Sequence, residues 1–240
     1  IASCLVGSEM CIRDRDGYVS ANQTGDAYTK ALKENNVEIV ENFEVSKINN
    51  SNNNYEIIDV HGKKINAKKI VLAAGVYLEK ILKLLDISIK IKCFPQQLIV
   101  TERMPELLKT VITVAHGKLS LKQFENGTVL IGGGWPGKGN IENGYNETIP
   151  ENLIGNMRLA CHAIPNLKNS RVSRVWLGLE AETDDAMPII GELPNLKNAF
   201  IIGSIHSGYT SGPYMGKLLS EKILGKDVDL SLFDIRRLMN

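Results

Sequence analysis

A glycine-rich segment near the C-terminus is the part of this sequence best suited to bind a ligand. The apolar run at residues 199–203 predicts a buried strand, and GSIHSGYTSGP follows at 203–213. We expect a turn over residues 203–212 and a helix from about Pro213 to Leu224, because proline is favoured at the start of a helix. Such a turn places free backbone N–H groups and the positive end of a helix dipole against a phosphate or a ring that gains negative charge. The alternative is a plain strand–turn–helix corner.

His206 lies inside this glycine-rich turn and is therefore a candidate for direct contact with a ligand. The alternative is a solvated turn residue. The other histidines lie at expected turns or in an expected helix, at His61, His116 and His162. The sequence has no G-x-S-x-G elbow, no H-E-x-x-H and no P-loop, so a nucleophilic hydrolase is disfavoured.

A second candidate is the end of the apolar run at residues 70–75, where Ala73, Ala74 and Gly75 follow Leu72. A continuous apolar run predicts a strand buried on both faces, as in a parallel sheet covered by helices. Small residues at its end let a ligand approach the backbone closely. Many α/β strands end in this way, so the segment alone is weak evidence for a site.

The acidic stretch at residues 180–185 is the one cluster that could suggest a metal. It contains Glu180, Glu182, Asp184 and Asp185. Their spacing does not align the carboxylates and no nearby histidine completes a ligand set, so we expect no metal site. The cysteines, none of them in a C-x-x-C pair, are expected to be free thiols in a reducing compartment: Cys4, Cys11, Cys93 and Cys161.

Several elements are expected to position these segments. Residues 22–35 read as a helix that stops at Asn36, and the alternation from Val37 through Ile39 to Val45 suggests short strands. A small antiparallel ribbon follows, with its turn at His61-Gly62. Further expected elements are helices at 77–85 and 150–163, a strand-rich region at 89–135 and a strand at 172–179.

Composition excludes several classes of protein. The 240 residues are 43% hydrophobic and 23% charged, with a formal net charge of +1. We therefore expect a globular protein that binds no nucleic acid and has no membrane span, and we predict a cytoplasmic location. Residues 1–15 have neither helical nor strand periodicity and resemble a translated adapter sequence, so we treat them as a non-native segment that contributes nothing to the core.

Taken in order, these segments resemble the FAD-dependent family of D-amino-acid oxidase, glycine oxidase and sarcosine oxidase. The likeness runs from Asp16-Gly17-Tyr18 through Ala73–Gly75 to the glycine-rich turn. It includes a T-x-D-x-x-P-x-I-G pattern that begins at Thr183 and ends at Gly191. Residues 119–123 and 126–136 look most like the branch of the sarcosine oxidase β-subunit and D-hydroxyproline dehydrogenase.

The resemblance implies an α/β fold with two domains. A Rossmann-like FAD-binding domain would comprise residues 16–88 and 184–240, and a mixed-sheet α+β substrate domain would comprise residues 89–183. Family members open with a strand, a G-x-G-x-x-G turn and an acidic residue for the ribose. No such opening precedes Asp16 in this sequence. The FAD-binding domain is therefore expected to be incomplete at its N-terminus, and this chain is expected to bind FAD poorly and to be inactive by itself.

The resemblance also implies a set of site residues. Cofactor contacts fall on Val45, Ala73, Ala74, Gly75, Gly203, Ser207, Gly208, Tyr209, Thr210, Ser211 and Gly212. His206, Tyr209 and Trp135 are candidates for contact with the substrate. Glycine oxidases carry an arginine that binds the substrate carboxylate at the position where Glu180 stands here. His206, Tyr209 and backbone N–H groups are then the possible hydrogen-bond donors to that carboxylate. Monomeric sarcosine oxidases attach the flavin through a cysteine at the place that corresponds to the surroundings of Gly178. No cysteine lies there in this sequence, so FAD is expected to be bound non-covalently.

The activity implied is oxidation of the C–N bond of a small amino acid or secondary amine, of the sarcosine, D-proline, hydroxyproline or glycine type, by hydride transfer to flavin. Two alternatives remain open. One is a flavin dehydrogenase of a 2-hydroxy acid, and the other is a non-catalytic subunit of a heteromeric oxidoreductase. A partner subunit is accordingly a further expectation.

Overall fold

A computed structural model describes residues 10–11, 17–51, 54–114, 117–139, 146–206 and 208–239. The chain forms two compact units. Unit 1 comprises Ile1–Ile39 and Pro95–Gly178, and unit 2 comprises Val40–Phe94 and Leu179–Asn240. The chain crosses between the units after residues 94 and 178, whereas the expected domain boundaries fall after residues 88 and 183. The N-terminal part differs, because residues 17–39 group with unit 1 and not with the segment that follows them.

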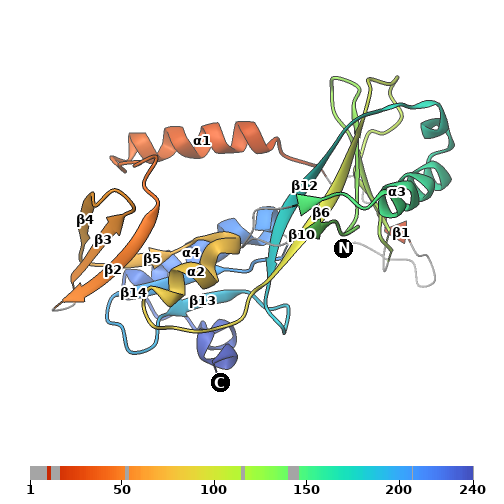
Figure 1. Ribbon diagram of the computed structural model, residues 1–240. Helices are drawn as coiled ribbons and strands as arrows, with labels where there is room; N and C mark the ends of the chain where they lie inside the picture. The colour runs from red at the N-terminus through yellow and green to blue at the C-terminus, as the bar shows by residue number, and fades with distance from the viewer. Residues whose placement is uncertain are drawn as a thin grey trace. The chain divides into compact units, whose positions relative to one another are not determined.

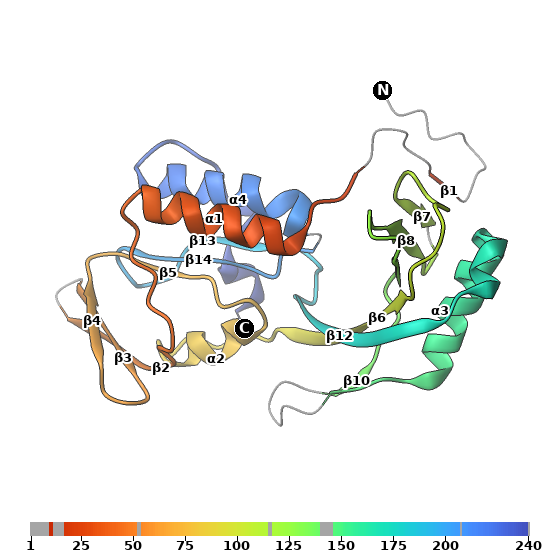
Figure 2. The ribbon, with the colours of Figure 1, turned by 90° about the horizontal axis from the view of Figure 1, so that it is seen from above.

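A three-stranded sheet forms the centre of unit 2. It has the order β13 (Ile189–Glu192), β14 (Ala199–Gly203), β5 (Ile70–Leu72). The middle strand β14 is antiparallel to β13 and parallel to β5. Figure 1 labels these elements, and Figure 2 shows helix α4 (Gly208–Ile223) on one side of the strands and α2 (Leu78–Lys83) on the other.

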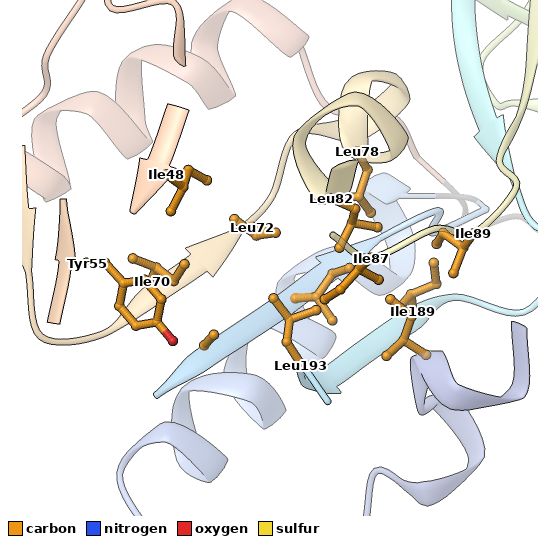
Figure 3. Packing of buried hydrophobic residues seen from close by; sticks show 13 residues of the cluster. Ile48, Tyr55, Ile70, Leu72, Leu78, Leu82, Ile87, Ile89, Ile189 and Leu193 are labelled. Carbon is orange, nitrogen blue, oxygen red and sulfur yellow. The ribbon is translucent and has the colours of Figure 1, made fainter. Parts of the chain in front are cut away.

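The alternation of side chains along these strands explains why helices cover both faces of the sheet. Ile189 and Ile201 belong to the apolar cluster that includes Leu78 of α2, and this cluster is drawn in Figure 3. Their neighbours Ile190 and Phe200 belong to a second cluster with Leu219 of α4. Successive side chains of a strand point to opposite faces, so each face of the sheet buries its own apolar set.

An antiparallel ribbon packs on the first of these clusters. It consists of β2 (Val45–Ser51), β3 (Asn54–Asp59) and β4 (Lys64–Ala67). Tyr55 of β3 is fully buried, and its hydroxyl donates to the backbone oxygen of Lys197 at 2.7 Å. The ribbon and its turn confirm the sequence prediction. Residues 37–44 form no strand, however: Val37 and Ile39 are exposed, and the Val37 N–H donates back to Leu32 of the preceding helix.

Unit 1 contains most of a six-stranded sheet, whose last two strands continue into unit 2. Its order is β1 (Met10–Cys11), β7 (Ile112–Val114), β8 (Ser120–Gln123), β9 (Val129–Gly132), β6 (Lys92–Thr101), β12 (Val172–Glu182). Helix α3 (Pro150–Ala163) and the 3₁₀ helix η2 (Pro165–Asn169) bury Ala160 and Leu167 against the sheet residues Ile99, Leu121, Val129 and Ile131. The strand-rich region, the strand near residues 172–179 and the helix beginning at Pro150 were all predicted from the sequence.

Helix α1 (Ala21–Glu34) begins and ends as its sequence predicts. The Ser20 hydroxyl accepts from the backbone N–H of Gln23, which caps the N-terminus. Asn36 follows the helix with a φ of 57°, the left-handed geometry of a helix stop. The shorter elements are η1 (Gly75–Tyr77), the pair β10 (Lys138–Gly139) and β11 (Asn146–Glu147), η3 (Ser231–Phe233) and η4 (Ile235–Leu238).

The N-terminal fifteen residues are described only in part. Met10 and Cys11 form β1, which pairs antiparallel with Thr113 and Val114. At these two positions the segment forms a regular element, contrary to the expectation drawn from its lack of periodicity. Leu5, Val6 and Ile12 lie outside the described residues. Among the described helices, none is both long and apolar enough to cross a membrane.

Candidate functional site

The ends of β5 and β14 lie side by side. The two strands are parallel, with Ile70 opposite Ala199 and Leu72 opposite Ile201. The chain therefore leaves both strands at the same edge of the sheet, through Ala73 on one and Gly203 on the other. Two segments that the sequence analysis named separately as candidate cofactor contacts therefore meet at one edge. The carboxyl ends of parallel strands are where open α/β sheets bind ligands.

Small residues let the two segments approach. Gly75 has a φ of 55°, in the left-handed region that glycine adopts most readily. A Cβ atom on Gly203 would lie 2.6 Å from the Leu78 side chain, so a larger residue there would displace α2. The prediction that β5 is buried on both faces is wrong at Val71, whose side chain is 46% exposed. In the described sheet β5 is an edge strand, and at Val71 no described element covers its second face.

Helix α4 starts earlier than the sequence predicts. It begins at Gly208, and Pro213 lies inside it. The expected turn therefore shrinks to the residues between Gly203 and Gly208, and residues 208–212 form the first helical turns. The apolar side chains of Met215, Leu218 and Leu219 pack on the sheet. This packing outweighs the cost of glycine and proline, which local propensity alone would place outside a helix.

His206 and Glu180 form a close pair beside these strand ends. The Nδ1 atom of His206 is 2.9 Å from Oε1 of Glu180, and both residues belong to unit 2. Their side chains are 66% and 36% exposed. Glu180 lies near the end of β12 and His206 just before α4. The pair thus places one proton-carrying ring and one carboxylate at the edge where β14 ends.

The other predicted site residues of unit 2 fall into two groups. Tyr209 is 60% exposed in the first turn of α4, next to the exposed Thr210. Ser211 and Gly212 are half-buried one turn along, and Ser207 lies outside the described residues. Val45 is half-buried at the start of β2 and packs on the cluster around Ile48 and Tyr55.

Ser204 is a site residue that the sequence prediction missed. It follows Gly203, is 5% exposed and has a φ of 50°. Its hydroxyl oxygen is buried without a hydrogen-bond partner among the described residues. A buried polar group normally has a partner, so an unpaired one at the end of this strand marks a place where a ligand atom can supply it. The sequence signal available was a serine directly after a strand-ending glycine.

The T-x-D-x-x-P pattern forms a pinned turn. Asp185 accepts hydrogen bonds from the Thr183 hydroxyl at 2.7 Å, from the Met187 N–H at 3.0 Å and from the Arg237 guanidinium at 2.7 Å. Arg237 also donates to the backbone oxygens of Met187 and Pro188. The Arg237 hydrogen bond, more than any other contact, holds the pKa of the Asp185 carboxyl well below its usual range. Arg237 itself was not predicted.

The neighbouring acid Asp184 belongs to a different contact. It pairs with Lys92 at 2.7 Å, which lowers the pKa of the Asp184 carboxyl and raises that of Lys92. In the described part of the chain no cluster of three or more His, Cys, Asp or Glu side chains is suited to a metal ion. The described cysteines, Cys93 and Cys161, are free thiols.

Trp135 lies in unit 1 and is half-buried. A Cβ atom on Gly155 would lie 2.6 Å from its ring, so the indole packs closely on α3. Its Nε1–H donates to the backbone oxygen of Lys118 at 2.5 Å. The side chain is therefore held by packing and by one hydrogen bond, which is the arrangement expected of a residue that stabilises unit 1.

Unit 2 thus has the features of an α/β ligand-binding unit with parallel strand ends and a helix N-terminus at one edge. A family model described as DAO, FAD dependent oxidoreductase, matches residues 6–222. The chain therefore belongs to the FAD-dependent oxidoreductase family, as the sequence resemblance predicted. The match begins before Asp16, where the motifs that carry the resemblance start.

Individual proteins are also similar to this chain. The chain is 29% identical over 222 residues to hydrogen cyanide synthase subunit HcnC of Pseudomonas protegens, covering 89% of this chain and 51% of that protein. Its fold is similar to the crystal structure of glycine oxidase from Geobacillus kaustophilus, with a TM-score of 0.81 and 20% identity over 93% of this chain and 60% of that one. It is also similar to L-proline dehydrogenase from P. horikoshii, with a TM-score of 0.79, 23% identity and coverage of 90% and 59%. The chain thus spans between 51% and 60% of the length of these proteins.

Proposed function

We propose that this chain is part of an FAD-dependent oxidoreductase that oxidises the C–N bond of a small amino acid or secondary amine. The observation that carries the proposal is the junction of β5, β14 and α4. There two parallel strand ends and a helix N-terminus of unit 2 meet at one edge. Among the similar proteins, glycine oxidase is named for a primary amino acid and L-proline dehydrogenase for a secondary one. Both names favour an amino-acid substrate.

The residues at this junction suit a flavin. Ala73, Ala74 and Gly75 offer a surface with little side-chain bulk, and Ser204 supplies a buried hydroxyl that has no hydrogen-bond partner among the described residues. When bound, FAD accepts a hydride from the substrate, and the charge it gains favours the positive end of a helix dipole. The first turn of α4, from Gly208 to Gly212, would hold the flavin ring, while the Val45 backbone would contact the adenine. Binding would be non-covalent.

The substrate is proposed to contact His206 and Tyr209, which are both exposed at the start of α4. Trp135 stays a proposed substrate contact, because an aromatic side chain restricts the position of a substrate without competing for hydrogen bonds. The complete protein is proposed to work with a partner subunit, since the similar HcnC is named as a subunit of a synthase.

The test is anaerobic mixing of the flavin-loaded enzyme with a panel of substrates. Sarcosine, D-proline, hydroxyproline or glycine should bleach the flavin absorbance, whereas 2-hydroxy acids should not. Bleaching by hydroxy acids alone would support the alternative dehydrogenase. A complete protein that binds no flavin would support a non-catalytic subunit instead. His206→Ala should raise the KM for the amine without loss of bound FAD. Wild-type kinetics in this variant would remove His206 from the site.

A further inference from the structure

We propose that Glu180 orients His206 as a base that removes the proton from the substrate ammonium group. This inference rests on the proposed function, because it assigns a chemical task to a pair inside that site. The observation is the 2.9 Å contact between Nδ1 of His206 and Oε1 of Glu180. A neutral imidazole has one donor nitrogen and one acceptor nitrogen, and the hydrogen bond that one nitrogen makes decides which of them carries the proton.

The geometry selects one tautomer. A carboxylate oxygen 2.9 Å from Nδ1 favours a proton on that nitrogen, because two lone pairs facing each other at this distance would repel. Nε2 then carries the lone pair. Among the residues that the structure describes, Glu180 is the one recorded polar partner of the His206 side chain. With 66% of the side chain exposed, the Nε2 edge is accessible to a substrate.

The pair lies in unit 2 where the lone pair on Nε2 of His206 could accept a proton from the substrate. His206 lies between the end of β14 and the start of α4, the segments that meet at the proposed flavin edge. Glu180 approaches from β12, a different element, so the ring is held from outside its own loop. A base carried on a loop alone would be free to turn, whereas a carboxylate from a neighbouring strand restricts the ring.

The chemistry requires such a base. An amine in its ammonium form has no lone pair, so no hydride can leave the adjacent carbon. Transfer of one proton from the ammonium to Nε2 of His206 gives the neutral amine and an imidazolium, whose charge Glu180 balances. Bound FAD would supply the oxidant, so that the hydrogen could leave with the C–H electron pair as a hydride while the nitrogen lone pair forms the second C–N bond. The substrate becomes an iminium ion, and the proton remains on His206 until solvent accepts it.

The assignment separates His206 from binding of the substrate carboxylate. That task is left to Tyr209 and to the backbone N–H groups at the start of α4. Glu180 acts through His206 and is a positioning residue, whereas His206 is catalytic because it contacts the substrate amine. A variant of either residue should therefore affect ammonium substrates in particular, and the defect should shrink as the assay pH approaches the pKa of the substrate amine.

The first measurement uses this chain without cofactor. Heteronuclear NMR of the imidazole nitrogens, at a pH where the ring is neutral, should report the Nδ1–H form for His206. Glu180→Leu should shift the ring towards the Nε2–H form, whereas the control Glu182→Leu, two residues along β12, should leave it unchanged. An Nε2–H ring in the wild-type chain, or no response to Glu180→Leu, would overturn the assignment regardless of any activity.

The second measurement uses the flavin-loaded enzyme and single-turnover flavin reduction by an amine below its pKa. His206→Ala should slow reduction by about 100-fold, the lower end of what general-base catalysis contributes. Added imidazole should restore part of the rate, because it can enter the vacated space. Tyr209→Phe should raise KM and should not respond to imidazole. If amines reduce the wild-type flavin but His206→Ala reduces equally fast at every pH, His206 is no base while the proposed function stands. If no amine reduces the wild-type flavin, the proposed function fails and the base role fails with it.

Discussion

Asp185 and Glu180 lie five positions apart in one acidic stretch, yet their surroundings differ completely. Asp185 accepts from Thr183, Met187 and Arg237, and its carboxyl titrates well below the usual range. Among the residues that the structure describes, Glu180 has one polar partner, the ring of His206. An acid surrounded by donors within its own turn stabilises that turn. A carboxylate whose partner is a single imidazole at a strand end can instead orient that ring for proton transfer. The comparison predicts opposite behaviour for the two carboxylates.

Removal of Arg237 should have the largest effect on stability. Its guanidinium, 21% exposed, bonds Asp185 and the backbone oxygens of Met187 and Pro188. Arg237→Ala leaves the Asp185 carboxylate without its cation, and we expect the free energy of unfolding to fall by about 3 kcal/mol. The measurement is urea denaturation of the chain. Arg236→Ala is the matched control, because its exposed pair with Asp234 should contribute about 0.5 kcal/mol. Equal losses in the two variants would contradict the pinned turn.

Asp185→Ala should come next, with a loss of about 2 kcal/mol. The value is smaller because the Asp185 side chain is 39% exposed, so solvent screens its pair with Arg237. Arg237 also keeps its bonds to backbone oxygens in this variant. The same denaturation experiment measures it, with Asp184→Ala as the control, which should leave the midpoint unchanged. A variant as stable as the wild type would show that Thr183 and Arg237 hold the turn without the carboxylate.

Acid should weaken the wild type more than Asp185→Ala. The pKa of Asp185 is lower in the folded chain than in the unfolded chain. Its contribution is therefore complete above the ordinary aspartate pKa of about 4 and is lost as the pH falls below that value. Four other carboxyls also have pKa values below their usual range and add to the same dependence of unfolding free energy on pH: Glu56, Glu79, Asp184 and Asp229. The quantity to measure is thus the difference in unfolding free energy between wild type and variant, which should narrow below pH 4. A constant difference would argue against an ionised Asp185.

Glu180→Leu should have the smallest effect on stability, within about 0.5 kcal/mol of the wild type. Glu180 is 36% exposed, and its partner His206 is 66% exposed, so little desolvated interaction is lost. Thermal unfolding would measure this, with Glu182→Leu as the matched control on the same face of β12. A large loss would place Glu180 among the residues that hold the fold together.

The sequence predicted those parts of the site that local patterns determine. The apolar runs before Ala73 and Gly203 predicted both strands, which pair in parallel in the structure. Helix α4 was placed five residues late, because glycine and proline propensities favour a loop there and only packing of Leu219 on the sheet reverses them. The partners of Asp185 and His206 could not be predicted, since Arg237 lies 52 residues from Asp185 and joins it through the tertiary fold.

The comparison is tested most directly by the rate of flavin reduction in two variants at matched FAD content. In the flavin-loaded enzyme, mixed anaerobically with an amine below its pKa, Asp185→Ala should reduce its flavin at the wild-type rate. Glu180→Leu should be slower by about tenfold or more, since a base without orientation loses part of its general-base contribution. If Glu180→Leu keeps the wild-type rate, or if Asp185→Ala loses as much, the division between a structural and a chemical carboxylate is contradicted.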